Sequence, residues 1–372
     1  MITYIYLFLF LALLSFTDYI YIPKLSRIQL LYIGGSFVFL LLWAFASLRW
    51  KTGTDWESYY DTFYYFSEEY AVNFEPGFAA FVSFIRNITS NYTVFLTIFS
   101  FICISLKFYF FHRFNKEFFF TLIFLYYCYY FGDIFAVRQS LAISLSLFST
   151  IFIINKKPFY FVLFICLATS IHTSSILYFF AYFIYWRKLS DKTFYYIIFF
   201  SILLGLIGFG GIILDLLFKA LGLDGFMGDK FNNYLKGEDE VVNNPFLSYI
   251  LGVSKRLLLI PLFIYVKNKT NERFIYFNGY FNLYMVGNII YFLFAKDLAI
   301  FARASVPFLL FEIFLLGYVL LYFKRDKKKL VFIFFIMILF SWARFTALVN
   351  SYYDLYVPYN SIFDDKIERK LE

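Results

Sequence analysis

Long apolar runs, separated by short polar or basic segments, recur along the whole chain and constrain its fold more than any other feature. A helix that crosses a bilayer needs about 20 apolar residues, because it rises about 1.5 Å per residue through a hydrocarbon core about 30 Å thick. Hydrophobic residues make up 62% of the 372 residues and charged residues 16%, which is too little polar surface for a water-soluble domain. The sequence therefore predicts an all-α, polytopic integral membrane protein.

A moving window of that length predicts about twelve transmembrane helices, with a range of ten to twelve. The predicted spans cover residues 2–17, 28–48, 91–111, 118–131, 139–154, 158–171, 173–186, 193–213, 247–266, 274–294, 301–323 and 330–349. Residues 158–186 leave two interpretations open, one long tilted helix or two short helices that meet at His172. We favour two, because a single helix would place His172 at mid-depth, where an ionisable group is costly.

Charge in the loops predicts the orientation. Lys and Arg are concentrated in alternate short loops, such as 187–192 and 324–329, and these are expected in the cytoplasm. The opposite set contains two long acidic loops, 49–75 and 214–246, which we expect outside together with both termini. No internal repeat or linker is evident, so residues 1–372 are treated as a single membrane domain.

The charge pattern argues against a nucleic-acid partner, and the cysteine pattern argues against disulfides and metal sites. The net charge of +8 arises in loops between apolar runs and not on one polar face, so the partner that it indicates is the lipid bilayer and not a nucleic acid. Cys103, Cys128 and Cys166 each lie inside an apolar run without a CxxC spacing, which favours small buried side chains over disulfides or metal ligands. No metal site and no cofactor are expected.

Several cationic or titratable groups fall at the predicted outer membrane face. They are Arg49, Arg138, Arg303, Arg344 and His172. Arginines near helix ends can simply extend to the interface, but this does not explain why arginine is chosen here while lysine is common in the cytoplasmic loops. Arginine offers a planar fork that binds phosphate through two bonds and keeps its proton. The pattern predicts a receptor for a lipid phosphate or pyrophosphate.

Four short motifs follow one another over residues 45–190. They are Arg49-x3-Gly53-Thr54-Asp55 with the pair Tyr59-Tyr60, Glu75-Pro76-Gly77, Arg138-Gln139 at the head of a helix rich in small residues, and His172-Thr173-Ser174-Ser175. In order and spacing they resemble the EpsG family of exopolysaccharide proteins, within the wider group of Wzy-type O-antigen and capsule polymerases. One departure is that Ala136-Val137 replaces the asparagine often found just before the Arg-Gln pair.

The resemblance implies a polysaccharide polymerase, a glycosyltransferase that joins undecaprenyl-pyrophosphate-linked oligosaccharide repeat units in O-antigen, capsule or exopolysaccharide synthesis. It implies a multi-pass protein of the bacterial cytoplasmic (inner) membrane with its active site facing outward. The lipid-linked oligosaccharide would be its substrate, and a chain-length regulator and a flippase are the further partners expected.

Chemistry at such a site assigns roles to the marked residues. Arg49, Arg138, Arg303 and Arg344 would bind the leaving pyrophosphate. A sugar hydroxyl needs a positioned base, and chemistry leaves His172 and Asp55 as candidates. The pKa of His172 suits a base near neutral pH, whereas Asp55 beside Arg49 would be held ionised, so we expect His172 as base or acceptor positioner and Asp55 as an acceptor-binding group. Asp55-Trp56-Glu57 has a spacing that can bind a metal ion. Such a spacing is common by chance in an acidic loop, so we favour metal-free chemistry.

Further residues are expected to bind the glycan. Rings of Trp56, Tyr59 and Tyr60 can stack on sugar faces, although an interfacial aromatic belt explains any single ring as well. Glu75 and Gln139 complete the predicted glycan-binding set.

Two other functions compete with a polymerase. An O-antigen ligase would use the same arginines with a different acceptor. A flippase or transporter of lipid-linked sugars would line a mid-membrane cavity with charge and often shows repeated halves, and the sequence shows neither feature.

Overall fold

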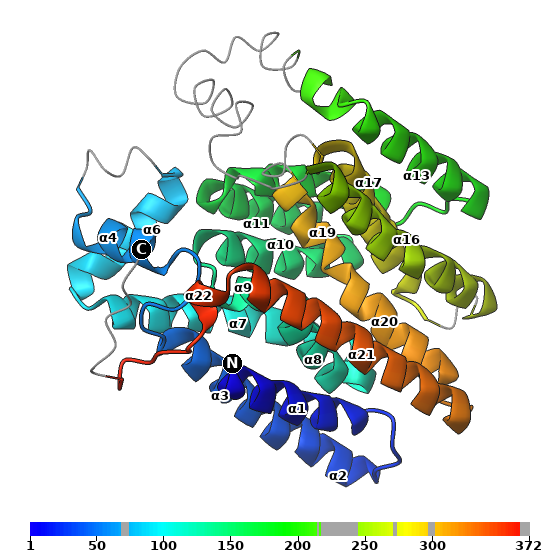
Figure 1. Cartoon of the computed structure of the whole chain (residues 1–372), viewed down its shortest axis with the longest axis horizontal. Coiled ribbons are helices and arrows are strands. Elements are labelled where there is room, and N and C mark those ends of the chain that lie inside the picture. Colours follow the sequence, from blue (N-terminus) through cyan, green and yellow to red (C-terminus); the bar gives the residue numbers. More distant parts are fainter. Residues whose placement is uncertain (68–73, 214–215, 217–244, 271–273, 297–301, 365–372) are drawn as a thin grey trace. The chain divides into compact units, whose positions relative to one another are not determined.

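The computed structural model describes residues 1–67, 74–213, 216, 245–270, 274–296 and 302–364 (Figure 1). Within these ranges the chain is helical and contains no β-strand. Lipid offers no partners for backbone amides, and a helix satisfies them within one segment, so a chain this apolar folds as helices. The all-α prediction is confirmed, whereas the predicted external loop 214–246 lies almost wholly outside the described residues.

The helices form two compact units, and the first contains residues 1–176 and 320–372. Its elements are α1 (Ile2–Phe16), α2 (Lys24–Gln29), the π-helical turn η1 (Leu30–Gly34), α3 (Gly35–Ser47), α4 (Trp56–Tyr64), α6 (Pro76–Ile88), α7 (Tyr92–Phe114), η2 (Lys116–Phe118), α8 (Phe119–Tyr129), α9 (Phe131–Phe135), α10 (Arg138–Ile154), α11 (Pro158–Ile171), α21 (Lys327–Ser351) and α22 (Tyr353–Tyr356). Every residue of α8 is buried, and α1 and α21 pack against it. The core of this unit therefore surrounds α8.

The second unit contains residues 177–319. Its elements are α12 (Phe180–Ile184), α13 (Asp191–Leu206), α16 (Pro245–Thr270), α17 (Phe277–Phe294), η5 (Arg303–Ser305) and α19 (Val306–Leu309), while η3 (Thr173–Phe179) and α20 (Phe311–Phe323) each run across a boundary between the units. Helices α13, α16 and α19 all pack on α17, which is the central helix of this unit. The prediction of one membrane domain for residues 1–372 stays a prediction.

The predicted apolar spans coincide with helices over most of their described residues. Among the described residues, five helices are long and apolar enough to cross a membrane: Lys24–Ser47, Tyr92–Phe114, Phe246–Thr270, Arg303–Phe323 and Lys327–Ser351. Shorter apolar helices cover Ile2–Phe16, Arg138–Ile154, Pro158–Ile171 and Thr173–Ile184. These helices fit a multi-pass membrane protein. The total of twelve spans and the outward position of the two long loops stay predictions.

The chain leaves its helical path at His172, where the sequence predicts a break. Helix α11 ends at Ile171, and His172 has extended backbone angles, φ −149° and ψ 112°. A 3-10 segment follows from Thr173. The break places the imidazole at a helix end, where its polar atoms can reach other polar groups.

Short helices gather at one end of the first unit. In Figure 1, α4 and α6 lie at the end of the long helices where α9 and α22 are also found. Residues 352–364, here named the C-terminal strap, return to this end and pair with the segment that follows α3: Trp50 N–H donates to the carbonyl of Asn360, and Ile362 N–H donates to that of Leu48, each at 2.9 Å. Segments far apart in the sequence thus meet where most of the marked residues lie.

Candidate functional site

The Glu75-Pro76-Gly77 motif opens α6, and each residue has its own structural task. Glu75 is the N-cap residue, and Pro76 occupies the first turn, where the missing N–H is not needed. Gly77 lies against Ser170 near the end of α11: a Cβ there would come within 2.2 Å of the Ser170 hydroxyl oxygen and 2.8 Å of its carbonyl oxygen. The motif therefore seats α6 directly on the end of α11 and brings the Glu75 side chain to the break at His172.

The Glu75 carboxylate joins three elements of the first unit. Arg138, the first residue of α10, donates from Nη1 to Oε2 at 2.7 Å. Thr173 donates to Oε1 from its backbone N–H at 3.3 Å and from its hydroxyl at 3.1 Å. Burial raises the pKa of Glu75, but the charge of Arg138 and the hydrogen bond from Thr173 outweigh it and hold that pKa below its usual value. Glu75 is therefore an ionised acceptor at neutral pH.

His172 and Tyr59 border this ion pair. The His172 imidazole lies near enough to the Glu75 carboxylate to lower the pKa of Glu75. Its Nδ1 is 2.8 Å from the Ser174 hydroxyl oxygen. Tyr59, on α4, has its hydroxyl close to the Arg138 guanidinium, and burial raises its pKa, so it stays a protonated donor. The structure thus brings together residues from α4, α6, α10 and the end of α11 that the sequence marked separately.

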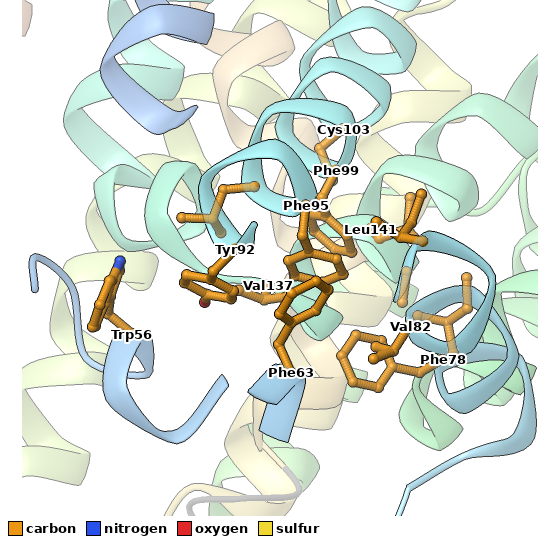
Figure 2. Close-up of a cluster of buried hydrophobic side chains, with 14 residues drawn as sticks. Trp56, Phe63, Phe78, Val82, Tyr92, Phe95, Phe99, Cys103, Val137 and Leu141 are labelled. Atoms are coloured by element: carbon orange, nitrogen blue, oxygen red, sulfur yellow. The ribbon is translucent and has the colours of Figure 1, made fainter. Parts of the chain in front are cut away.

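Aromatic packing holds α4 in place. Figure 2 shows Phe63 of α4 against Phe95 of α7, with Phe78 of α6 on one side and Tyr92 and Trp56 on the other. Trp56 is 3% exposed and stacks on Tyr60 with ring centroids 4.9 Å apart. Trp56 is a core residue in this arrangement, and the rings that reach the surface are those of Tyr59 and Tyr60. The predicted stacking of sugars on the three rings is not tested by this packing.

Arg49 lies beneath the C-terminal strap and is 2% exposed. Its Nη1 is 3.5 Å from the carbonyl oxygen of Ile134, and its guanidinium is 5.5 Å from the ring centre of Phe135. Burial lowers the pKa of Arg49, while Asp55 and nearby tyrosine hydroxyls act in the opposite direction. Arginine keeps its proton in proteins, so a whole positive charge is enclosed here.

Buried hydrogen-bond donors without an acceptor cluster around this arginine. Within the described part of the chain no partner is present for Nε and Nη2 of Arg49, Nε1 of Trp56, Nδ2 of Asn360 and the hydroxyl of Tyr92. Tyr92 lies within electrostatic range of Arg49, and its ring packs edge-on against Trp56 at 5.4 Å. Unpaired buried polar groups are rare and costly, so this surplus of donors indicates a place for water or an anion.

A buried ion pair that the sequence analysis did not single out lies below the site. Lys107 of α7 contacts Asp133 of α9 at 2.6 Å, with side chains 1% and 8% exposed. Tyr126 donates to Asp133 Oδ2 at 2.6 Å, and Lys107 donates to the Ser140 hydroxyl at 3.0 Å. A cavity of about 10 Å³, enough for one water molecule, is lined by Arg49, Asp133 and Ser140 among others. The sequence signal that could have identified this pair is a lysine inside the apolar run 91–111, because charged residues within membrane-spanning segments are rare and usually paired or functional.

The other predicted site residues have different surroundings. Arg344 of α21 stacks on Tyr129 of α8, with Cζ 4.0 Å from the ring centre. Arg303 is exposed and belongs to the second unit. Gln139 follows Arg138 on α10 and is partly buried. Asp55 precedes α4, is exposed and lies within electrostatic range of Arg49 and Tyr59.

Within the described ranges, no three His, Cys, Asp or Glu side chains are placed to hold a metal ion. The expectation of metal-free chemistry stays a prediction. Among the described residues, the guanidinium groups of Arg49 and Arg138 supply positive charge at the site.

Comparison with known proteins gives one match. No curated protein and no solved structure matches the chain. The EpsG family matches residues 32–361, which include every motif described above. The Glu-Pro-Gly motif that seats α6, the Arg-Gln pair that opens α10 and the His172 break are all parts of the matched region, and the chain belongs to the EpsG family.

Proposed function

We propose that the chain is a polysaccharide polymerase, a glycosyltransferase that transfers a growing glycan from undecaprenyl pyrophosphate to a sugar hydroxyl of the next lipid-linked repeat unit. The observation that carries this proposal is one electrostatic neighbourhood in the first unit. Arg49 and Arg138 supply positive charge there, and Asp55, Glu75 and His172 supply groups that can accept a proton. Transfer from a pyrophosphate to a hydroxyl needs both kinds of group.

The cationic side of the site suits the leaving group. As the bond from the anomeric carbon to the pyrophosphate breaks, negative charge builds on the phosphate oxygen, and donors fixed in a dry site stabilise it without reorganisation. Arg138 is half-buried and reachable, and the surplus donors around Arg49 lie deeper. Guanidinium forks neutralise this charge without a metal ion, which supports metal-independent transfer.

Two residues remain candidates for the base. For His172 to accept a proton at Nε2, its Nδ1 must carry the other proton and donate it to the Ser174 hydroxyl oxygen, which the 2.8 Å contact permits. Asp55 is exposed and lies within electrostatic range of Arg49, a position from which its carboxyl group can orient an acceptor hydroxyl. We keep His172 as base or acceptor positioner and Asp55 as acceptor-binding, with Tyr59, Tyr60 and Gln139 as glycan contacts.

The cellular setting follows from the proposed substrate. Undecaprenyl-linked repeat units reach a polymerase after a flippase has moved them across the bacterial cytoplasmic membrane, so the site would face outward. A chain-length regulator would act on the same product. An O-antigen ligase would need the same leaving-group chemistry, and the two functions differ only in the acceptor.

The glycan phenotype of a deletion strain tests the proposal. A polymerase is expected to leave single repeat units on the cell surface while long chains disappear, and the plasmid-borne wild-type chain should restore the long chains. Gel separation of the surface glycan gives the length distribution. Loss of all surface glycan would instead indicate a flippase or a ligase and would overturn the polymerase assignment.

A further inference from the structure

The Glu75 carboxylate occupies the place at Arg138 that a phosphate group would take. Arg138 Nη1 donates to it at 2.7 Å, while Arg138 Nε is buried and has no hydrogen-bond partner among the described residues. The side chains of Arg138 and Glu75 are 22% and 18% exposed, so a ligand can reach the pair. A guanidinium that is to bind pyrophosphate must first share or give up this internal carboxylate.

We infer that Glu75 is an exchangeable latch: donor pyrophosphate displaces it from Arg138, and the released carboxylate then takes the proton of the acceptor hydroxyl. The inference rests on the proposed polymerase function and adds a third candidate base to His172 and Asp55. It links two steps that a polymerase must keep in order, since the base becomes available only when the donor is bound.

The surroundings of Glu75 support an exchange and not a permanent structural bond. Oε1 accepts two hydrogen bonds from Thr173, of 3.1 and 3.3 Å, and both are on the exposed side. Glu75 is the N-cap residue of α6, but its side chain makes no capping hydrogen bond. The carboxylate can therefore leave Arg138 without unravelling the helix that it begins.

The loss of the free charge of Arg138 on phosphate binding would also shift the pKa of Glu75 in the direction that a base requires. Arg138 on α10 holds the pKa of Glu75 below its usual value, and among the described residues His172 at the end of α11 and Tyr59 on α4 also face the carboxylate. When phosphate neutralises Arg138, the main cause of that lowering is removed, and Glu75 becomes a stronger base. A carboxylate released in this way meets the geometric need of general base catalysis if the acceptor hydroxyl comes within about 3 Å.

The step balances without any further reactant. The acceptor oxygen forms its bond to the anomeric carbon and gives its proton to a Glu75 oxygen. The bond from the anomeric carbon to pyrophosphate breaks, and its electron pair leaves with the phosphate that Arg138 holds. When undecaprenyl pyrophosphate departs, Glu75 loses the proton to water and pairs with Arg138 again.

The first experiment measures binding of undecaprenyl pyrophosphate to the purified full chain in lipid nanodiscs. Glu75→Gln removes the competing charge, so it should bind the probe about tenfold more tightly than wild type. Thr173→Val removes one of the two bonds on Oε1 and should tighten binding by a smaller factor. Asp61→Asn, an exposed carboxylate on α4, is the matched control and should bind as wild type does.

The second experiment measures surface glycan length in a deletion strain carrying each variant. Glu75→Gln should abolish long chains despite its tighter binding, whereas Thr173→Val, which keeps the carboxylate, should retain them. If Glu75→Gln fails to fold, Thr173→Val alone still tests the latch through its affinity.

Each result has a separate meaning. A wild-type chain that does not bind undecaprenyl pyrophosphate would overturn the proposed function. Binding by wild type with equal or weaker binding by Glu75→Gln and Thr173→Val would overturn the latch and leave the function standing. Tighter binding by Glu75→Gln with long chains intact would remove Glu75 as the base.

Discussion

Arg49 and Arg138 are the same side chain in two different regions of the first unit. Arg138 begins α10 at the surface, and the Glu75 carboxylate balances its charge. Arg49 is enclosed under the C-terminal strap with Nε and Nη2 unpaired within the described residues, and the hydrogen bond from its Nη1 to the Ile134 carbonyl oxygen is long, at 3.5 Å. The same group thus occurs in two arrangements: an accessible guanidinium paired with a carboxylate, and an enclosed guanidinium with two nitrogen donors that have no partner among the described residues.

The largest effect is expected from breaking the Lys107–Asp133 ion pair, which lies beneath both regions. Lys107 bonds to Ser140 near Arg138, and Asp133 precedes Ile134, which contacts Arg49. Lys107→Met should destabilise the protein by about 3–5 kcal/mol, because it leaves a buried carboxylate without its cation. Thermal unfolding in detergent measures this. The double variant with Asp133→Asn should recover most of the loss, and a single variant as stable as the double would show that the pair carries no charge coupling.

Arg138→Lys comes next and tests the surface region alone. The substitution keeps the charge but loses the planar fork, so polymerisation should fall by about 10²-fold while the amount of protein in the membrane is unchanged. Glycan length in a complemented deletion strain gives the readout. Arg113→Lys, at an exposed position on α7, is the control. Chains of wild-type length in the Arg138 variant would mean that Arg138 only reaches to the interface.

A smaller effect is expected from loosening the strap over Arg49. The Thr52 hydroxyl oxygen accepts from Asn360 N–H at 3.2 Å, so Thr52→Val should cost about 1 kcal/mol of stability. It should also expose Arg49 to phenylglyoxal, a reagent that modifies arginine, as read by mass spectrometry of the digested protein. In wild type, Arg138 should react and Arg49 should be protected. Equal labelling of both in wild type would remove the contrast between an enclosed and a reachable arginine.

The smallest effect concerns pH and the Glu75–Arg138 pair. The folded-state pKa of Glu75 lies below its usual value of 4.5, so above that value the pair contributes its full stability. The contribution, below about 1 kcal/mol for a pair this accessible, is lost as pH falls from 4.5 through the folded-state pKa. Glu75→Gln should flatten that part of the melting-temperature profile, and an unchanged profile would show that the pair is not coupled to folding.

Much of the site could be read from the sequence because its residues lie in local motifs. Glu75-Pro76-Gly77 marks a helix start, and Gly77 is needed because Ser170 leaves no room for a Cβ. His172 predicts its own helix break through the cost of a buried ionisable group. The motifs did not reveal that Glu75 pairs with Arg138, since residues 63 positions apart meet only through the packing of α6 on α11 and of α11 on α10.

The amino-acid pattern alone predicts that the chain forms apolar helices and where most of them begin and end, because backbone groups in lipid must be paired within each segment. Which charged side chains are exposed follows from how the helices and loops pack together. This packing buries Arg49 by returning residues 352–364 over the segment after α3, and it hides Lys107 and Asp133 against each other between α7 and α9. Exposure depends on long-range packing, which no local pattern encodes, and so the difference between Arg49 and Arg138 appears only in the folded chain.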